Sequence, residues 1–451
     1  MSSNNKGLNR KPILLLAVSL FLGSLPNAFA IGQLSLESNG FLRRSIDRPD
    51  STQTISIGPK LTGEGKYVES NLDVRGIVQM SARSSFTVEG PNAYIATSDQ
   101  VSKHYKTTLG RKSFSWSQMD DYWDFGTYSP RFVWDPTRPQ KIGMTGVFQQ
   151  FKNQHMQVTA FGSPLSVPER GFPTREENGL IKSDSPFNIP LYEYVELQGR
   201  VYPIRYDIRY PDMSKLLLNP NAALSVRYEN SPDRGYWAQA SVGYLPIHQV
   251  TLNVETDGAF DAQAQQVNLL VYPKVIMHKM ATIETGVKAK RFALWGSLTR
   301  EMPDENITEP TYLSPLIQNS VIASIGGSVK ITQMITFQSS FLHIAEDAAP
   351  PKAEANDVTV DLQSRFPFHR AIRSHLDIAT GTRMSYRLGW IRDLQNSSDQ
   401  LMSDVIYQLN KKSRNLTLNV GADFFITETG KGYIGQYKGN DRVRGAIAYA
   451  F

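Results

Sequence analysis

The chain ends in the stretch VRGAIAYAF, which runs from Val443 to Phe451. Read in steps of two, one series of this stretch is apolar or aromatic apart from one glycine: Val443, Gly445, Ile447, Tyr449 and Phe451. The other series continues from Arg442 and Arg444 into alanines. A period of two predicts a β-strand with one apolar face. Because terminal residues usually fray unless they are tied down, we expect this strand to pair with another strand.

The other end of the chain predicts export. Residues 1–11 carry three basic side chains and no acid, and an apolar run of 11 residues follows from Ile13 to Gly23. This run is shorter than the ~20 residues that cross a bilayer as a helix. Together with the small residues Ala28 and Ala30, it predicts a signal peptide over residues 1–30. A retained membrane anchor is the alternative interpretation. The chain contains no cysteine, which argues against a bacterial lipid anchor and a disulfide framework.

The charge balance of the chain argues against a strongly basic surface. About half of the formal net charge of +6 lies in the predicted signal peptide, so the remaining chain is close to neutral. This balance argues against nucleic acid as a partner. A soluble chain of 451 residues would be expected to contain helices and several domains. No segment after residue 30 has the periodicity of a long amphipathic helix.

Strand-like alternation recurs instead, in segments of about ten residues separated by turn residues. Clear cases are RVYPIRYDIRY (200–210), AALSVRYE (222–229), HQVTLNVET (248–256) and NLTLNVGADFFI (415–426). Strands in soluble sheets average about five or six residues, whereas tilted membrane-spanning strands need about 9–11. Aromatic residues recur near the strand ends, where the girdles of membrane barrels lie. The pattern predicts an all-β, antiparallel transmembrane barrel of about 18 strands (range about 16–20) without a separate plug domain. A soluble β-sandwich or β-helix is the alternative.

The role of the final strand follows from the chemistry of a membrane interior. Every backbone N–H and C=O group in hydrocarbon must be paired, so a sheet spans a membrane only if its last strand closes on its first. The export signal, the strands and the terminal phenylalanine together resemble porin-like outer-membrane β-barrel proteins of Gram-negative bacteria. The resemblance implies insertion among outer-membrane lipids by the barrel-assembly machinery. It also implies an assembly signal in the final strand, formed by Val443, Ile447, Tyr449 and Phe451.

The most informative loop spans residues 113–140 and contains Trp116, Trp123 and Trp134. Disordered loops are poor in tryptophan, so we expect this loop to pack against the rest of the protein. Its position after an early strand is similar to that of the porin loop that folds into the barrel and narrows it. A loop that only caps the outer rim is the alternative.

The porin resemblance also places charged residues at this narrowing. It implies that Arg111, at the end of the preceding strand, lies in the wall of the constriction. Arg111 would there face the loop acids Asp120 and Asp121. Arg131 is a further candidate for a pore-lining cation within the loop.

Two further long loops carry weaker signals. Residues 166–190 are rich in charge, proline and glycine, which predicts a mobile extracellular loop. Residues 346–357 contain no aromatic residue, which predicts simple surface. Adjacent loops are together candidates for a lid or for a docking surface for a partner.

The charged faces of the strands are expected to line the lumen, because a charged side chain at the lipid midplane costs about 2–4 kcal/mol. The surplus of basic residues on these faces favours anionic or hydroxyl-rich solutes, since arginine binds carboxylate and phosphate groups bidentately. Alternatively, the mixed charges only keep the lumen hydrated. The candidate pore-lining residues on strands are Arg205, Asp207, Arg209, Arg227, Lys288, Arg442 and Arg444.

Three functions are compatible with such a barrel. The main hypothesis is a channel for hydrophilic solutes, anionic or saccharide in kind. The second is an export barrel that receives a secreted polymer, such as exopolysaccharide, from a periplasmic partner, with the aromatic loop stacking on sugar rings. The third is a non-transporting adhesin, receptor or structural barrel. The seven histidines form no recognisable catalytic or metal-binding pattern, so we expect no enzyme activity, cofactor or metal. Whether the barrel forms a homotrimer is left open.

Overall fold

The structure is a computed structural model that describes most of the chain from Ala28 onward, so the described part includes the last three residues of the predicted signal peptide. The described residues are 28–42, 51–80, 85–189, 191–231, 234–255, 260–307, 315–347, 365–409, 416–428 and 430–450. Residues 1–27, which hold most of the predicted signal peptide, lie outside this part. Phe451, the last residue of the predicted assembly signal, lies outside it as well.

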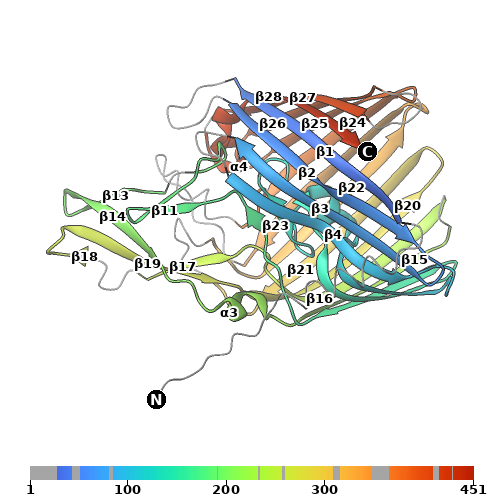
Figure 1. The fold of residues 1–451 in the computed structure, drawn as a ribbon, viewed down its shortest axis with the longest axis horizontal. Coiled ribbons are helices and arrows are strands. Elements are labelled where there is room, and N and C mark those ends of the chain that lie inside the picture. The colour runs from blue at the N-terminus through green and yellow to red at the C-terminus, as the bar shows by residue number, and fades with distance from the viewer. Residues whose placement is uncertain are drawn as a thin grey trace, which may run out of the picture.

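A closed barrel of 18 antiparallel strands forms the body of the molecule (Figure 1). The prediction of an all-β antiparallel barrel with 18 strands is therefore confirmed. The described chain begins in the barrel wall, and no plug domain is present among the described residues. The barrel strands are β1 (Ala28–Phe41), β2 (Ser51–Glu64), β3 (Val68–Met80), β4 (Ser85–Thr97), β5 (Tyr105–Lys112), β8 (Met144–Lys152), β9 (Met156–Ser163), β15 (Asn221–Glu229), β16 (Gly235–Pro246), β20 (Met277–Lys288), β21 (Phe292–Pro303), β22 (Ser320–Lys330), β23 (Ile335–Glu346), β24 (Arg370–Thr380), β25 (Met384–Asp393), β26 (Ser398–Gln408), β27 (Leu416–Thr427) and β28 (Arg442–Ala450).

The final strand closes the barrel. β28 pairs with β27 on one side and with β1 on the other, where Ile447 lies opposite Leu36. Val443, Ile447 and Tyr449 are exposed on the outer face, while Arg442 is buried on the inner face. The expected alternation and the expected closing role of this strand are thus confirmed.

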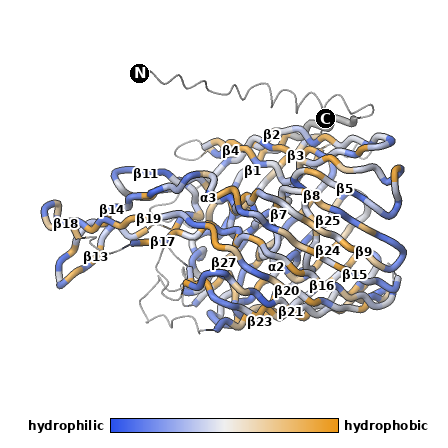
Figure 2. Tube along the Cα trace, turned by 90° about the horizontal axis from the view of Figure 1, so that it is seen from below, coloured by the Kyte–Doolittle hydropathy of each residue, from blue (hydrophilic) through white to orange (hydrophobic). Residues whose placement is uncertain are grey.

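The two faces of the wall differ in polarity, as Figure 2 shows by the alternation of hydrophilic and hydrophobic residues along the strands. On β20, the inward Thr282 and Glu284 are buried, whereas the outward Ile283 is 68% exposed. The next outward positions on the neighbouring strands are also apolar, with Leu298 53% and Ile325 65% exposed. An apolar outer band and a polar lumen match a barrel surrounded by lipid.

The connections differ at the two ends of the barrel. At one end, which holds the first residue of β1 and the last residue of β28, strands are joined by short turns such as 289–291 and 381–383. At the other end, the connections include the long segments 113–143, 164–220 and 247–276. We call these the short-turn end and the long-loop end.

A second, smaller sheet projects from the long-loop end and lies at the left of Figure 1. Its strands are β13 (Tyr194–Leu197), β14 (Arg200–Ile208), β19 (Gln266–Lys274), β17 (Thr251–Glu255) and β18 (Phe260–Asp261). We call it the loop sheet, because its strands come from two different loops and meet where β14 and β19 pair in parallel. The segments RVYPIRYDIRY and HQVTLNVET therefore lie in the loop sheet, and their prediction as barrel strands was wrong.

The reason for this error is that a half-buried strand alternates wherever its buried face is covered. In the loop sheet the cover is an apolar cluster rather than lipid. Ile204 and Tyr206 of β14 pack there with Val267, Leu269 and Val271 of β19.

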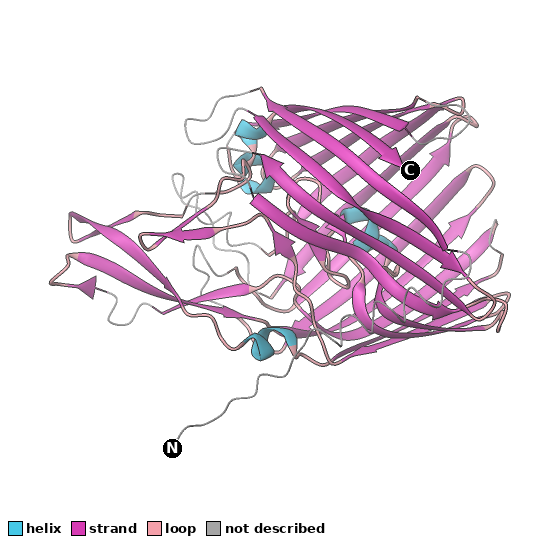
Figure 3. Ribbon diagram, in the orientation of Figure 1, coloured by secondary structure: helices cyan, strands magenta, loops and turns pink. Residues whose placement is uncertain are grey.

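The remaining elements are short and lie in the long loops. Figure 3 shows a short helix, α2, inside the barrel. No helix among the described residues is long and apolar enough to cross a membrane. The short elements are α2 (Gln118–Trp123), β6 (Arg131–Val133), β7 (Gln140–Lys141), β10 (Arg170–Gly171), β11 (Arg175–Glu177), β12 (Leu180–Lys182), α3 (Met213–Leu217), α4 (Gly432–Gln436) and a 3₁₀ turn (Lys438–Asn440).

The loop of residues 166–190, for which mobility was predicted, contacts the barrel mouth through Phe187. Phe187 of this loop is buried and makes edge-to-face contacts with Phe41 and Tyr437. Of the loop 346–357, only Glu346 and Asp347 belong to the described residues.

Candidate functional site: the lumen constriction

Residues 113–143 form a loop that enters the lumen, and we call this segment the constriction loop. The carbonyl oxygen of Trp116 accepts hydrogen bonds from Gln239 Nε2 and Ser241 Oγ of β16, both at 2.7 Å. Trp123 Nε1 lies 3.3 Å and 3.2 Å from the hydroxyls of Ser324 and Ser340, on β22 and β23. The loop is thus bound to the inner wall, and the alternative of a loop that only caps the rim was wrong.

A buried carboxylate in the wall holds the start of α2. One oxygen of Glu284 accepts hydrogen bonds from the hydroxyl of Ser117 (2.7 Å) and the amide of Met119 (3.1 Å). The other oxygen accepts from the amide of Gln118 (2.8 Å). The first amides of a helix have no partner within the helix and carry partial positive charge, so a carboxylate there is stabilising. Glu284 is 1% exposed, which strengthens these bonds.

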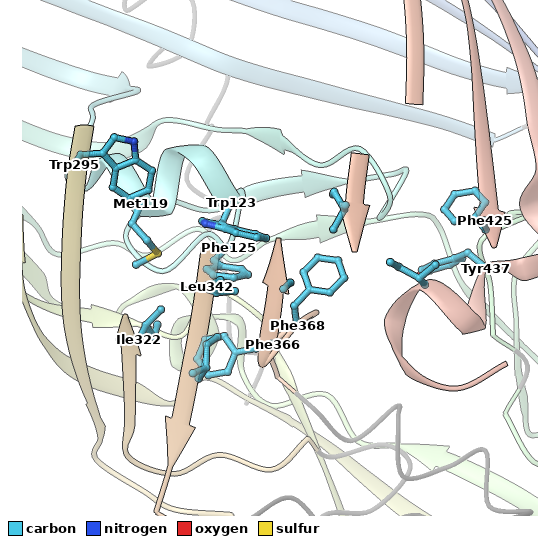
Figure 4. Close-up of a cluster of buried hydrophobic side chains, with 14 of the residues drawn as sticks. Met119, Trp123, Phe125, Trp295, Ile322, Leu342, Phe366, Phe368, Phe425 and Tyr437 are labelled. Atoms are coloured by element: carbon cyan, nitrogen blue, oxygen red, sulfur yellow. The ribbon is translucent and has the colours of Figure 1, made fainter. Parts of the chain in front are cut away.

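An aromatic cluster packs the loop against the nearby strands β22 and β23, as the close-up in Figure 4 shows. Met119, Trp123 and Phe125 of the loop are buried in one cluster with Ile322 and Leu342 of β22 and β23. Packing of this extent requires the loop to remain folded in the lumen, because swinging it out would expose the whole cluster to water.

The two loop acids that were predicted to face Arg111 have other partners. Asp120 lies within the loop, where Thr127 and Tyr128 donate their amides to its carboxylate. Burial raises the pKa of Asp120, and the hydrogen bonds from Thr127 oppose that rise. Asp121 binds Lys141 and accepts a 2.5 Å hydrogen bond from Ser115.

Arg111 faces neither of these two acids, so that prediction was wrong. Its guanidinium binds Glu89 of β4 at 3.1 Å and the carbonyl of Gly90 at 3.0 Å. Glu89 is 3% exposed, and Arg111 is partly buried beside it. The residue types in the sequence were compatible with either partner, and the tertiary fold brought Arg111 to Glu89.

Arg131 fixes the loop to the neighbouring loop 166–190. Its Nε and Nη2 atoms lie 2.6 Å and 3.2 Å from the two carboxylate oxygens of Glu169, and its Nη1 donates to the carbonyl of Asp124 at 2.6 Å. Burial opposes the charge of Arg131, but Glu169 outweighs burial and raises the pKa of the guanidinium.

Arg138 bridges the lumen from the loop to the wall. Its Nε and Nη2 contact Asp423 of β27 at 3.1 Å and 2.5 Å, and its Nη1 lies 2.8 Å from Asp404 of β26. Burial opposes the charged form, yet Asp423 and Asp404 raise the pKa of Arg138.

The predicted arginines of the final strand complete this network. Arg442 Nε donates to Asp423 at 2.7 Å, and its Nη2 donates to Asp135 of the loop at 2.5 Å. Arg444 Nη2 donates to Asp404 at 2.5 Å. Both arginines lie on the inner face, as expected. Each buried charge has an opposite partner, which is the condition for retaining charges away from bulk water.

The loop leaves two polar cavities, one on each side of Arg138. The Arg387 cavity has a volume of about 290 Å³ and is bordered by Arg373, Arg387 and His375 of the wall. The Trp134 cavity has a volume of about 410 Å³ and lies between the loop and β1–β4. Arginines outnumber carboxylates around them. The arginines are Arg75, Arg131, Arg138, Arg373, Arg387, Arg442 and Arg444, and the carboxylates are Glu37, Glu89, Asp124, Asp135 and Asp404.

The other predicted lumen residues separate into two groups. Arg227 and Lys288 lie on the inner face of β15 and β20 and meet at Glu229. Arg205, Asp207 and Arg209 are exposed on the loop sheet, so their predicted place in the barrel wall was wrong. Nothing in their alternation distinguishes the two settings, because both leave charged side chains in water.

Several residues of the constriction were missed by sequence reasoning. Asp404 and Asp423 sit at inward positions of β26 and β27, where the alternation of NLTLNVGADFFI already placed Asp423 opposite the apolar series. Glu301 is fully buried, accepts from both Nη atoms of Arg365 (2.6 Å and 2.8 Å), and lies 2.9 Å from His278 Nδ1. No local pattern marks this group. Among the described residues, no group of three or more histidines and carboxylates is suited to a metal ion.

Comparisons with known proteins find similar folds but no related sequence. No protein-family model matches the chain, and no curated protein matches it. Similar solved structures include OpdL of Pseudomonas aeruginosa, at 9% identity and a TM-score of 0.49 over 95% of this chain and 99% of that chain. OccK11 (OpdR) of the same species has 9% identity and a TM-score of 0.48 over 95% and 96%. A triple mutant of the Rhodopseudomonas blastica porin has 9% identity and a TM-score of 0.39 over 94% and 100%. At these scores the similarities add no argument about function.

Proposed function

We propose that the protein is an outer-membrane channel that passes small hydrophilic solutes, with a preference for anions. The closed wall leaves no unpaired strand edge, and its outward side chains are apolar over the middle of the strands. A barrel with these two properties is stable in hydrocarbon and encloses water. The proposal includes export by residues 1–30 and assembly through the final strand.

The observation that carries the proposal is the constriction loop bound inside the lumen. The loop is anchored to the wall at Glu284 and at Arg138, and cavities of about 290 Å³ and 410 Å³ remain beside it. The two cavities beside it carry more arginines than carboxylates. A solute that crosses the narrow region must therefore pass close to several guanidinium groups, which favours carboxylate and phosphate groups over cations.

Arg387 is the best-placed cation for testing this preference. It lines the Arg387 cavity, and its side chain is 64% exposed, with a single ion pair of 2.6 Å to Asp377 among the described residues. Because it does not anchor the loop, its charge can be reversed without removing a contact of the constriction.

The test is the reversal potential of the refolded protein in a planar bilayer under a KCl gradient. We expect anion preference in the wild type, and Arg387→Glu should lower the anion-to-cation permeability ratio by about half or more, since electrostatic selectivity follows the charge of the lining. Arg205→Glu is the matched control, because it makes the same charge change on the loop sheet outside the lumen. A wild-type barrel that folds but stays closed would contradict the channel, and equal effects of both variants would contradict the assigned lining.

The structure does not favour the polymer-export hypothesis through its aromatic loop. Stacking on sugar rings needs accessible ring faces, but Trp116 and Trp123 are 1% and 4% exposed and pack against protein side chains. Of the three tryptophans, Trp134 alone is partly exposed, beside the Trp134 cavity. We therefore propose a non-enzymatic solute channel rather than an export conduit.

A further inference from the structure

The outer wall carries a groove of about 700 Å³ that the channel function does not use. We call it the outer-wall groove. Four adjacent strands, β20 to β23, supply its apolar walls, and β24 borders one end. Its apolar lining consists of Ile283, Leu298, Ile325 and Phe341, which are outward residues of the lipid-facing band.

The floor of the groove is made by two small residues. Ala323 lies opposite Leu298 on one side and His343 on the other, and Gly296 lies opposite Ile325. A Cβ atom added to Gly296 would meet nothing closer than the carbonyl oxygen of Ser324, at 4.0 Å. The groove is therefore open space, because Gly296 has no side chain and the side chain of Ala323 is small. It is wide enough for a hydrocarbon chain.

Basic side chains lie at the end of the groove that is nearer the long-loop end of the barrel. His343 and Arg370 border the groove and face each other across β23 and β24. Arg300 and Lys279 are exposed on the outer face of β21 and β20 near the same end. Neither Arg300 nor Arg370 makes an ion pair with any described residue, whereas Lys279 lies 3.4 Å from Asp304.

The opposite end of the same strands is different. The outward side chains there are apolar or aromatic: Val287, Phe292, Val329 and Phe337. A charged side chain that faces lipid is costly at the midplane, and the cost falls to about 0–1 kcal/mol near the headgroups. The exposed cations at the short-turn end of these strands, Lys290, Arg291 and Lys330, lie in a turn or at the last residue of a strand. Arg300, Arg370 and His343 are instead outward residues of the strands without carboxylate partners among the described residues, which favours an anionic headgroup at their level.

We propose that the outer-wall groove binds one phosphorylated membrane lipid, with an acyl chain along Gly296 and Ala323 and a phosphate group against Arg370 and His343. Guanidinium–phosphate contacts are charge-assisted and bidentate, and they are stronger where water is scarce. An acyl chain lying in the groove makes van der Waals contacts with the recessed floor that lipids packed along the surface of the wall cannot make. This inference rests on the membrane location in the proposed function.

A second copy of the chain is the competing occupant, because a recessed apolar wall also suits a subunit interface. The unpaired cations argue against it. Related copies would bring like charges together at the edge of the contact, and charged residues are depleted from interface cores.

The test is native mass spectrometry of the detergent-purified full chain titrated with diphosphorylated lipid A, phosphatidylethanolamine or inorganic phosphate. We expect one lipid A per barrel, retained at least tenfold more strongly than phosphatidylethanolamine and not displaced by inorganic phosphate. The double variant Arg370→Gln/His343→Gln should lose that selectivity, and Gly296→Leu should weaken lipid A binding tenfold by filling the floor.

Gly162→Leu is the matched control for the filled groove. Gly162 is also an outward glycine, on β9, with no atom within 4 Å of an added Cβ, and the substitution should leave lipid binding unchanged. Equal lipid binding by all variants, displacement by inorganic phosphate, or a trimer mass that Gly296→Leu abolishes would each overturn the proposal. Conductance of the same preparations separates the two proposals, because a conducting barrel without selective lipid binding refutes only this one.

Discussion

The constriction loop and the loop sheet are both insertions at the long-loop end, yet the first lies inside the lumen and the second projects away from the barrel. The constriction loop turns inward and is fixed by buried ionic contacts, such as those of Glu284 with the start of α2. The loop sheet projects outward and is fixed by apolar side chains between β14 and β19. Its charged residues, such as Arg205 and Asp207, remain exposed.

The difference shows what each location demands of a loop. Inside the barrel most of the surrounding wall is polar, so the loop binds there largely by matching polar groups on the wall one by one, in addition to the apolar cluster at Ile322 and Leu342. Outside, the loop sheet covers its own apolar face and needs no partner on the wall. The contrast predicts that replacing a single polar residue disrupts the constriction loop, whereas the loop sheet tolerates the replacement of one of its exposed polar residues.

The largest effect is expected for Glu284→Ala. Removal of the carboxylate leaves the hydroxyl of Ser117 and the amides of Gln118 and Met119 without their acceptor, which costs about 3–5 kcal/mol by analogy with a broken buried charge contact. We expect a lower unfolding midpoint in detergent and a larger, noisier conductance. Glu255→Ala, on the loop sheet, is the control. Wild-type conductance in Glu284→Ala would show that the aromatic cluster alone holds the loop.

A pH dependence of similar size is expected at His248, which joins the two regions. Its Nε2 donates to the carbonyl of Tyr128 at 3.0 Å. Burial lowers the pKa of His248 from 6.5 to about 3, and this hydrogen bond opposes the fall. The unfolded chain therefore takes up the proton first, so stability is complete above pH ~6.5 and falls by about 1.4 kcal/mol per pH unit below it.

This pH effect is measured as the free energy of unfolding at pH 7 and pH 4.5 in the wild type and in His248→Gln. The wild type should lose about 2–3 kcal/mol more than the variant. His155→Gln, at an exposed turn, should behave like the wild type. Equal losses in all three proteins would mean that His248 is accessible to protons in the folded state.

A moderate effect is expected for Arg138→Gln. The substitution removes the cation between Asp404 and Asp423, at a cost of about 2 kcal/mol for charged hydrogen bonds. The network then gains a net negative charge, so anion preference should fall while conductance rises. Reversal potentials measure this change, and Arg209→Gln on the loop sheet serves as the control. An unchanged reversal potential would place the ion path away from Arg138.

The smallest effect is expected for Gly199→Ala, in the turn between β13 and β14. Gly199 has φ +76° and no atom within 4 Å of an added Cβ, so only the backbone conformation is strained. A left-handed conformation costs a residue with a side chain about 1–2 kcal/mol. Hydrogen exchange in β13 and β14 should increase while conductance stays unchanged. A change in conductance would couple the loop sheet to the lumen.

The sequence by itself determined the class of the fold. Strict alternation over about ten residues predicts long half-buried strands, and the pairing rule of hydrocarbon then requires closure into a barrel. The final strand was identified in this way, including the inward Arg442 and Arg444 and the outward Val443 and Ile447. The tryptophans of residues 113–140 predicted that this loop packs against the protein, and the porin resemblance implied that it folds inward.

Only the tertiary structure decided which alternating segments enter the wall and which charges meet. RVYPIRYDIRY and AALSVRYE have the same period, but the first lies in the loop sheet and the second is β15. The contacts of the constriction join residues 167 positions apart, as in Ser117 and Glu284, or 285 positions apart, as in Arg138 and Asp423. Periodicity is a local property of the chain, whereas these partners are chosen by the register and closure of the whole barrel.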